Sequence, residues 1–482
     1  MTVIAELVVV GAGPAGIAAA ITASQAGVDV TLIDSTPWPG GQYFKQPPAA
    51  FQSEDHSGHH AEAQQLFKRL ASSEVHLLAN TLVWGIFEGP QAGMWRLMLH
   101  GPDAPAFLDS GAVILASGAF DRSIPFPGWD LPGVITTGAA LNMIKTQGVL
   151  PGKRVVLSGS GPLQLAAAAH LVQGGAQVAA VCESATNLLW RGIRHLPAVW
   201  GQWGRMQEGL DFMRTLAGAR VPYRVGWAVT AVRGHGSVNE AVISKLDSSG
   251  KATPRSETIQ AVDAVVVGYS LTPDTALCRQ LNCEMEFDPL RGGFIPRRTK
   301  DMETSHAGIY AVGDGAGIGG AEMAMIEGRI AAYHAATQLS RMTERTARQA
   351  AASEQPALRR EQRFARLLGD LFTPPAGYYT LASPDTIICR CEQITLGQIR
   401  EALSYGVQTV GDVKSLVRTG MGNCQGRTCG SIVAQILAAE TGRTLKDVRY
   451  FNIRPPVHPL PLAVIEEFGK DLGPADQAGA SA

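Results

Sequence analysis

The chain has 482 residues, 45% of them hydrophobic and 17% charged, which is too long for one typical domain and suits about three. Its 41 basic and 42 acidic residues nearly cancel, so the charge gives no reason to expect nucleic acid or an anionic membrane as a partner. The seven cysteines are not arranged as the disulfide framework of a secreted protein, and we find neither a signal peptide nor an apolar run of about eighteen residues. We therefore expect a cytoplasmic, multidomain protein of a redox type.

The sequence of residues 7–34 predicts a strand, a turn, a helix and a second strand. The strands, Leu7–Val10 and Val28–Ile33, are apolar, as buried parallel strands are. A G-x-G-x-x-G turn joins the first strand to the helix, and its candidate cofactor-binding residues are Gly11, Gly13, Pro14, Ala15 and Gly16. Its glycines permit a tight turn, a close approach to a pyrophosphate and close packing of the helix on the strand. Asp34 ends the second strand, where a carboxylate can bind ribose hydroxyls, so we predict a dinucleotide site rather than a merely tight turn.

A later segment indicates that the dinucleotide is FAD. In residues 308–332 an apolar strand leads into Gly313 and Asp314, followed by small residues and a helix. This resembles the second FAD motif of the two-dinucleotide-fold flavoproteins, the glutathione-reductase superfamily. The resemblance implies that the aspartate binds the ribityl chain and that the helix points its N-terminus at the pyrophosphate. Residues 263–268 resemble a strand-end motif of the superfamily's second fold.

Two shorter segments extend the resemblance. Residues 112–118 are similar to the superfamily's A-T-G strand end, with Ser117 in place of threonine before Gly118. The superfamily also places Gly41 and Gln42, which follow the ribose acid, beside the flavin; an ordinary proline–glycine turn is the alternative. Three nearby histidines in a polar stretch are expected in a solvated loop rather than at a metal site, namely His56, His59 and His60.

Residues 153–183 repeat the strand–turn–helix–strand pattern, as expected of a second nested Rossmann fold. Gly159, Gly161 and Glu183 are its candidate nucleotide-binding residues. The third glycine is replaced by Gln164, whose side chain should push the helix from the strand or displace a pyrophosphate. NAD, ATP or another adenine ligand, and no ligand at all remain open for this fold.

The cysteines ahead of the C-terminal region argue against a disulfide reductase. Such members of the superfamily carry C-x4-C shortly after the first ribose acid or C-x-x-C in the second fold, whereas no cysteine lies between Asp34 and Cys182. Cys182 ends an apolar strand and is expected in the core, and Cys278 and Cys283 lie beyond the second fold and are expected to be structural. Residues 187–223, rich in aromatics, form either a helical insertion with its own core, which we favour, or a surface for another subunit.

The segment after the flavin motifs predicts a charged helix, which Pro356 is expected to break. Prolines and turn residues in 372–386 then predict a linker. Beyond it, capping-box patterns start helices at Thr395 and Thr409, and Ser431 is expected to cap a third.

Four cysteines follow the linker as C-x-C and C-x4-C, namely Cys389, Cys391, Cys424 and Cys429. Four thiolates so grouped suit an iron–sulfur cluster or a tetrahedral metal, and the glycines of 420–430 let the backbone pass close to an inorganic core. The runs C-R-C-E and G-M-G-N-C-Q-G-R-T-C resemble the bacterioferritin-associated-ferredoxin-like [2Fe–2S] domain over residues 385–445, which implies a [2Fe–2S] cluster on these cysteines. Structural zinc, for which C-x2-4-C pairs are commoner, and unligated thiols are the alternatives.

Nearly the whole chain resembles the α subunit of hetero-oligomeric FAD-dependent amino-acid dehydrogenases, which include opine oxidases, proline and hydroxyproline dehydrogenases and hydrogen cyanide synthase. The resemblance implies an α/β fold class, with two nested Rossmann-like dinucleotide-binding folds and a small helical C-terminal iron–sulfur domain. The expected parts are a discontinuous FAD-binding domain (1–120 and 269–340), a second Rossmann-like domain (150–268) with an insertion near 187–223, a connector (341–384), the [2Fe–2S] domain (385–450) and a Pro-rich tail (451–482).

The resemblance also implies a division of labour between subunits. In that family the amino or imino acid (an opine, proline, hydroxyproline or glycine) is oxidised on a D-amino-acid-oxidase-like flavoprotein β subunit, so the catalytic residues are expected on the partner. Electrons would then pass to FAD and the cluster of this chain and on to a respiratory or other acceptor. A further candidate partner is a small ferredoxin-like protein of the same complex, and peripheral contact with the inner face of the membrane is also expected. A self-contained NADH-dependent flavin/iron–sulfur reductase and a non-enzymatic assembly scaffold are the rival interpretations. The substrate, the stoichiometry and the terminal acceptor stay open.

Overall fold

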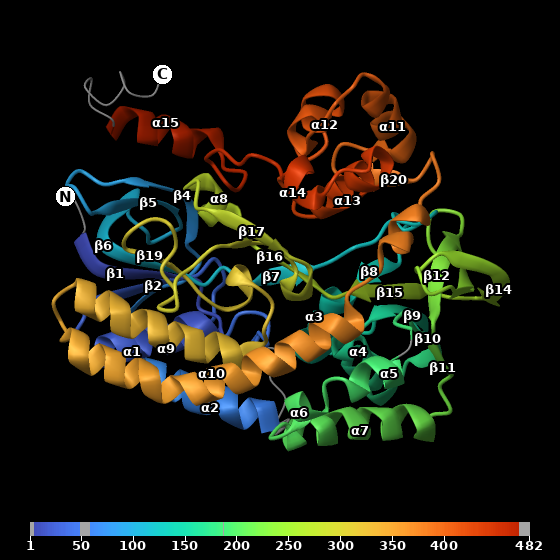
Figure 1. Ribbon diagram of the computed structural model, residues 1–482, viewed down its shortest axis with the longest axis horizontal. Helices are drawn as coiled ribbons and strands as arrows, with labels where there is room; N and C mark the ends of the chain where they lie inside the picture. Colours follow the sequence, from blue (N-terminus) through green and yellow to red (C-terminus); the bar gives the residue numbers. More distant parts are fainter. Residues whose placement is uncertain (1–3, 49–57, 187, 472–482) are drawn as a thin grey trace.

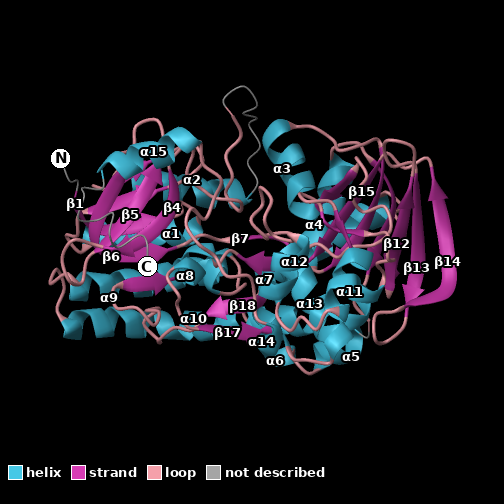
Figure 2. Cartoon of the chain, turned by 90° about the horizontal axis from the view of Figure 1, so that it is seen from above, coloured by secondary structure: helices cyan, strands magenta, loops and turns pink. Residues whose placement is uncertain are grey.

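The computed structural model describes residues 4–48, 58–186 and 188–471. Figure 1 shows a mixed sheet near the N-terminus, a parallel sheet at the other end, and a C-terminal helical domain above the second sheet and the strands that link the two. Figure 2, seen from above, separates the first sheet at one end of the molecule from a three-stranded antiparallel sheet at the other.

The first sheet has seven strands in the order β3-β2-β1-β6-β5-β4, with β19 paired to β6. Their bounds are β1 Ile4–Val10, β2 Val30–Ile33, β3 His76–Leu78, β4 Leu82–Glu88, β5 Trp95–His100, β6 Phe107–Leu115 and β19 Ile309–Ala311. The pairs of β1 with β2 and β6, of β2 with β3 and of β6 with β19 are parallel, and β4 and β5 extend the sheet antiparallel. The central strands are buried on both faces, which explains their apolar sequences. Both predicted strands exist, with starts shifted to Ile4 and Val30.

The second sheet is parallel, in the order β11-β10-β9-β15-β8, and an antiparallel sheet β12-β13-β14 lies beside it. The bounds are β8 Val134–Thr136, β9 Arg154–Ser160, β10 Gln177–Glu183, β11 Tyr223–Val225, β12 Trp227–Arg233, β13 Glu240–Leu246, β14 Ala252–Gln260 and β15 Ala264–Tyr269. Two short antiparallel pairs complete the strands of this part of the chain: β7 Ala119–Asp121 with β16 Leu271–Pro273, and β17 Met285–Asp288 with β18 Gly293–Pro296. Since β7 and β16 join the two large sheets, we call them the linking strands.

Two alanine-rich helices, α1 (Pro14–Gln25) and α9 (Ala321–Gln338), share a core with one face of the first sheet. They touch backbone to backbone, because a Cβ on Gly328 would lie 2.2 Å from the carbonyl oxygen of Ala15. The other helices before the C-terminal domain are α2 Gly58–Ala71, α3 Thr137–Gln147, α4 Pro162–Gln173, α5 Leu188–Ile193, α6 Leu196–Val199, α7 Trp203–Gly218 and α8 Ala276–Gln280. His59 and His60 therefore lie in the first turn of a helix rather than in a loop, and His56 lies outside the described residues.

Helix α10 (Glu344–Phe372) is continuous, so the predicted break at Pro356 is wrong. A proline inside a helix costs roughly 3 kcal/mol. Here buried side chains occur on both sides of it, Ala351 before and Leu358 after, and each fully buried leucine returns about 1.5–3 kcal/mol. In Figure 1 the helix runs beneath the first sheet toward the second, where Leu367 packs with the insertion helix α6.

The C-terminal domain contains the hairpin β20 (Ile387–Cys389) and β21 (Ile394–Thr395) and the helices α11 Leu396–Ser404, α12 Val410–Val417, α13 Cys429–Thr441 and α14 Leu445–Val448. Thr395 and Thr409 form the capping boxes predicted for α11 and α12. The third helix starts at Cys429, so the predicted cap at Ser431 is wrong.

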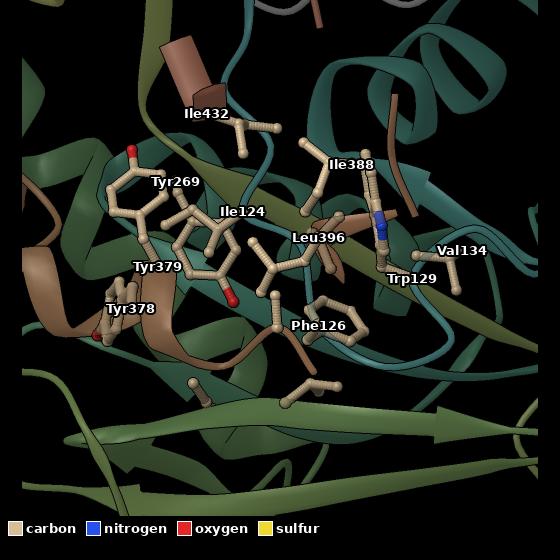
Figure 3. Packing of buried hydrophobic residues seen from close by; sticks show 14 of the residues in the cluster. Ile124, Phe126, Trp129, Val134, Tyr269, Tyr378, Tyr379, Ile388, Leu396 and Ile432 are labelled. Carbon is tan, nitrogen blue, oxygen red and sulfur yellow. The ribbon is translucent and has the colours of Figure 1, made fainter. Parts of the chain in front are cut away.

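The buried residues of this domain and those of the second sheet form one continuous core. Figure 3 shows Ile388, Leu396 and Ile432 packed in one cluster with Phe126 and Trp129. Trp129 Nε1 donates to the carbonyl oxygen of Ile387 at 2.6 Å, and Arg390 stacks on its ring.

The segment predicted as a linker is part of the same packing. Tyr378 and Tyr379, in the 3-10 helix η4 (Ala376–Thr380), are buried in the shared cluster and are labelled in Figure 3. The prolines and turn residues therefore belong to an irregular segment that is packed in the core and not to an exposed linker.

The end of the described chain returns to the first sheet. Val457 is buried there and its N–H donates to the carbonyl oxygen of Trp84, and a last helix, α15, covers Leu462–Asp471. Within the described ranges, no helix combines the length and apolar character needed to cross a membrane.

Candidate functional site

The glycine turn between β1 and α1 is built as the sequence predicts. Gly11 has φ +103, and a Cβ there would lie 2.4 Å from the carbonyl oxygen of Ala116, so no other residue fits without strain. A Cβ on Gly16 would lie 1.8 Å from the carbonyl oxygen of Gly11, which is the close helix–strand packing expected of the third glycine. Gly13 differs, because the nearest atom to a Cβ there is 3.9 Å away. The space above Gly13, before Pro14 and Ala15 begin the helix, is therefore open for a ligand.

Asp34 lies at the end of β2 and faces this turn. Its Oδ2 accepts from the N–H of Ala12 at 2.6 Å, and its Oδ1 accepts from the N–H and hydroxyl of Thr36 at 2.8 and 2.6 Å. The predicted loop lies against the same turn, since Gly40 donates to the carbonyl oxygen of Ala12 at 2.7 Å. Thus the turn and the first acid form one cradle.

Gly41 and Gln42 lie at the rim of this cradle. A Cβ on Gly41 would lie 2.8 Å from the Cα of Gly13, so the loop packs directly on the turn. Gln42 is exposed and accepts from Asn142 Nδ2 at 3.0 Å.

The second flavin-type motif, Gly313 and Asp314, lies next to α9. Asp314 Oδ1 accepts from the N–H groups of Gly319 and Gly320 at 2.9 and 3.0 Å, while burial raises the pKa of this carboxyl. Its Oδ2 has no hydrogen-bond partner among the described residues, so it is available to a cofactor hydroxyl.

A buried ion pair holds this motif, and the sequence interpretation missed it. Glu327, 1% exposed, forms two bonds of 2.8 and 2.9 Å with Arg298, which is 8% exposed. Glu327 also accepts from the N–H of Gly313 at 2.9 Å. A glutamate in an otherwise small-residue and apolar stretch of α9 was the available signal, because such a carboxylate is buried only with a partner.

In the second fold the candidate nucleotide residues are covered by the chain itself. Glu183 is fully buried and accepts from the N–H groups of Gly161 and Ala185 at 3.0 and 2.8 Å, and burial raises its pKa. The side chain of Phe372 lies 3.6 Å from where a Cβ of Gly161 would be. Tyr378 donates to the carbonyl oxygen of Ser184 at 2.6 Å, so the end of α10 and η4 closes over the ends of β9 and β10.

Gln164 does not push the helix away as expected. It is buried, its Nε2 donates to the carbonyl oxygen of Cys182 at 3.0 Å, and its Oε1 would lie 2.4 Å from a Cβ on Gly159. The side chain thus fits between strand and helix only because position 159 is glycine.

The four C-terminal cysteines come together as two hydrogen-bonded pairs, Cys389 with Cys429 and Cys391 with Cys424. Hydrogen bonding to Cys429, and then to backbone N–H groups including that of Gly420, lowers the pKa of the Cys389 thiol to about 5. This favours the thiolate, the form that binds iron. Among the described residues no three Cys, His, Asp or Glu side chains are arranged around one metal ion. Two pairs of thiols suit two irons better than one zinc.

The glycines of the cysteine loop pack closely against side chains of the domain. A Cβ on Gly420 or Gly426 would lie 2.7 or 2.6 Å from the ring of Phe451, and one on Gly430 would lie 2.7 Å from the hydroxyl of Tyr450. A Cβ on Gly422 would lie 2.2 Å from the Cβ of Cys391. The described contacts of these glycines are therefore with side chains of the domain itself.

A chain of contacts connects the flavin-type strand end to the cysteine loop. Ser117 Oγ donates to the carbonyl oxygen of Asp274 at 2.6 Å, and Asp274 N–H donates to the carbonyl oxygen of Gly118 at 2.9 Å. The carboxylate of Asp274 accepts from Arg427 at 3.2 Å, and Arg427 donates to the carbonyl oxygen of Cys424 at 3.4 Å. Sequence reasoning missed Asp274 and Arg427, because their pairing depends on how the C-terminal domain docks.

Comparisons with known proteins agree with this geometry. Residues 5–339 match the family model described as pyridine nucleotide-disulphide oxidoreductase, and residues 387–439 match the BFD-like [2Fe-2S] binding domain. The chain belongs to the pyridine nucleotide-disulphide oxidoreductase family. It is 34% identical over 468 residues to a subunit of opine oxidase from Agrobacterium tumefaciens (strain Ach5), covering 95% of this chain and 90% of that protein. It is 33% identical over 482 residues to hydrogen cyanide synthase subunit HcnB of Pseudomonas aeruginosa, covering 96% and 99%.

These matches confirm the α/β fold class, the C-terminal iron–sulfur domain and the resemblance to the subunits of this group. The fold is shared with L-proline dehydrogenase from P. horikoshii, with a TM-score of 0.68, 19% identity, and coverage of 96% of this chain and 80% of that chain. The chain is an oxidoreductase subunit of the pyridine nucleotide-disulphide oxidoreductase family.

The two family matches imply that this chain binds FAD and a [2Fe–2S] cluster as its cofactors. The residues present fit both groups. The open space at Gly13 and the carboxylates of Asp34 and Asp314 suit a dinucleotide, and four thiols in two pairs suit a cluster.

Proposed function

We propose that the chain is the electron-transfer subunit of a multi-subunit dehydrogenase whose amino- or imino-acid substrate is oxidised at a CH–NH or CH–NH2 bond on a partner flavoprotein. The observation that carries the proposal is the contact path from Ser117 through Asp274 and Arg427 to Cys424, which ties the flavin-type motif to the cysteine loop. When bound, FAD takes up two electrons and releases them singly, which suits a one-electron cluster beside it. The electrons then leave to a respiratory or other acceptor. The name opine oxidase supports an amino-acid derivative as the donor class.

Each group of residues has a separate task in this proposal. The glycine turn takes the pyrophosphate, and Asp34 accepts from ribose hydroxyls. Asp314 Oδ2 accepts from a hydroxyl of the ribityl chain, while Gly319 and Gly320 hold its other oxygen. The four cysteines hold the cluster, with Cys389 already favoured as thiolate. Asp274 and Arg427 fix the C-terminal domain on the flavoprotein body.

The second fold is proposed to take no nucleotide in this arrangement. Glu183 would have to reach a ribose, yet it is buried, whereas Asp34 of the first fold is partly exposed. Phe372 covers the turn at Gly161, where a pyrophosphate would lie. This weighs against the rival interpretation of a self-contained NADH-dependent reductase.

A partner subunit has a suitable surface to bind on α7. Four exposed residues follow one another at helical spacing, namely Trp203, Met206, Leu210 and Met213, and the ring of Trp200 meets that of Trp203 edge to face. Such a row of exposed aromatic and methionine side chains is typical of a protein interface. Both relatives named above are subunits of larger enzymes, which favours another subunit of the enzyme as the occupant.

Replacing Trp203 with glutamate should prevent assembly with the co-expressed partner, because a charge would be buried in an apolar interface. Trp203 is 65% exposed in the free chain, so folding should be unaffected. Size-exclusion chromatography with co-expressed partner measures the loss. The matched control is Leu462→Glu, at another exposed apolar position, on α15, where assembly should be retained. Equal assembly of Trp203→Glu and wild type would contradict the assignment of this surface.

Gly13→Ala should keep the fold and weaken FAD binding, because its Cβ would lie no closer than 3.9 Å to the nearest described protein atom but would intrude on the pyrophosphate. We expect FAD affinity to fall at least about tenfold, or about 1.4 kcal/mol. Fluorescence titration of apoprotein with FAD measures it, and the thermal midpoint of the apoprotein should not change. Gly16→Ala is the contrasting variant, since its Cβ strikes the backbone of Gly11 and should unfold the first sheet. If Gly13→Ala binds FAD as tightly as the wild-type chain, the glycine turn does not contact the cofactor.

Stopped-flow reduction tests the function itself. The isolated chain mixed with NADH should keep its flavin oxidised, whereas the native complex mixed with its amino-acid substrate should bleach it and then reduce the cluster. Screening opines, proline, hydroxyproline and glycine with an artificial acceptor identifies the donor. Rapid bleaching of the isolated chain by NADH would establish the rival reductase instead. Full turnover of a complex that contains a cluster-free chain would favour the scaffold interpretation.

A further inference from the structure

A cavity of about 210 Å³ lies where the linking strands, the β17–β18 hairpin and the C-terminal domain meet. Its lining includes Arg122 directly after β7, Thr272 on β16 and Tyr379 in η4, and it is completed by Ser431 and Gln435 on α13. At about 30 Å³ for each water-sized group, it has room for about seven non-hydrogen atoms. A small organic molecule can therefore be enclosed between the flavoprotein body and the C-terminal domain.

Among the described residues, the lining of the cavity carries one positive charge and no negative charge. Arg122 is the only charged residue among the described residues of its lining. Its Nη2 donates to the carbonyl oxygens of Leu271 and Gly292 at 3.2 and 2.7 Å, and its Nε has no hydrogen-bond partner among the described residues. No carboxylate of the described chain is paired with this guanidinium. Because an uncompensated charge in the interior is unfavourable, an anion beside Arg122 would stabilise the folded state.

Hydroxyl donors and aromatic rings complete the lining. Within the part of the chain that the structure describes, the buried hydroxyl of Thr272 also has no hydrogen-bond partner. Burial raises the pKa of Tyr379 and raises that of Tyr450 to about 12, so both hydroxyls stay protonated at neutral pH and can donate to an anion. Phe287 and Phe294, whose ring centroids are 5.1 Å apart, supply an apolar wall.

We propose that this cavity binds a small organic monocarboxylate of the size of a short 2-oxo acid, with its carboxylate on Arg122 and its carbon chain against the phenylalanine rings. A single guanidinium matches a single carboxylate, and the aromatic wall favours an organic anion over inorganic phosphate. The bound molecule touches both the linking strands and α13, whose first residue is Cys429. It therefore fastens the C-terminal domain to the body, whichever donor the complex oxidises.

Isothermal titration of the purified, cofactor-loaded chain with pyruvate tests the site, with acetate and inorganic phosphate as further probes. We expect pyruvate to bind and to raise the thermal midpoint, and Arg122→Met to weaken it at least about tenfold, the loss expected for one charged hydrogen-bonded partner. Arg297→Met removes an exposed arginine after β18, 72% exposed, and should leave the affinity unchanged.

Three titration results with the wild-type chain or Arg122→Met would overturn the proposal. They are the failure of pyruvate and acetate to bind at millimolar concentration, binding unaffected by Arg122→Met, and phosphate binding as tightly as pyruvate, which would mark a general anion site. Arg122 also donates to two backbone carbonyl oxygens, so Arg122→Met could fail to fold. A second variant tests the site in that case. Thr272→Val keeps the side-chain shape and removes only the unpartnered hydroxyl. This variant should bind pyruvate several-fold more weakly than the wild-type chain. Unchanged affinity for pyruvate would equally overturn the proposal.

Discussion

Cys424→Ala should yield a folded flavoprotein that lacks the iron–sulfur cluster. A [2Fe–2S] cluster needs four ligands, and alanine supplies none, so iron should fall from about two atoms per chain to none. Cys424 is half-buried and pairs with the exposed Cys391, so the loss should leave the shared core of Figure 3 intact. Iron and acid-labile sulfide analysis and the EPR spectrum of the dithionite-reduced protein measure the cluster, and flavin absorbance measures FAD.

The control for this experiment is Cys182→Ala. Cys182 is buried in β10 and is not one of the four paired cysteines, so its removal should leave iron content and the EPR signal as in wild type. Full iron content in Cys424→Ala would show that the four cysteines do not act together. Loss of iron in both variants would point to general destabilisation.

Glu327→Ala should destabilise the folded chain by about 3–5 kcal/mol, because removing one partner of a buried ion pair leaves the other charge unpaired. Arg298 would lose both carboxylate contacts, and the N–H of Gly313 would lose its acceptor. The same residue orients Gly313 and Asp314, so FAD should also dissociate more readily. Urea unfolding measures the stability, and flavin release on dilution measures the cofactor.

Glu344→Ala provides the matched comparison. Glu344 is 67% exposed and pairs with Arg348 one turn along α10. A surface pair of this kind contributes only about 0.3–0.5 kcal/mol. Similar unfolding midpoints for Glu327→Ala and Glu344→Ala would mean that the buried pair does not hold the motif.

Local patterns were sufficient for the parts of the fold that depend on neighbouring residues. The strand–turn–helix of Gly11 to Gly16 and the capping boxes of Thr395 and Thr409 are short-range, and each is found in the structure. Their physical cause lies within a few residues of the motif, where sequence reasoning works.

The features that sequence reasoning missed arise from contacts between distant segments. Pro356 remains inside a helix because α10 buries residues on both sides of it. Glu183 is buried because η4, almost two hundred residues later, folds over it. Gly420 and Gly426 admit the ring of Phe451, a contact that the sequence did not indicate. In each case a tertiary contact that no local pattern reveals determines the outcome.

Because the second sheet and the C-terminal domain share one core, the C-terminal domain is not expected to fold as an independent unit. Excised at residues 385–450, the iron–sulfur domain would expose Ile388, Leu396 and Ile432 to water and lose the packing of Trp129. Heat or denaturant should therefore melt it together with the second sheet as one cooperative unit. The separation between the two cofactor sites is accordingly fixed when the chain folds, and no hinge needs to close before an electron can move between them.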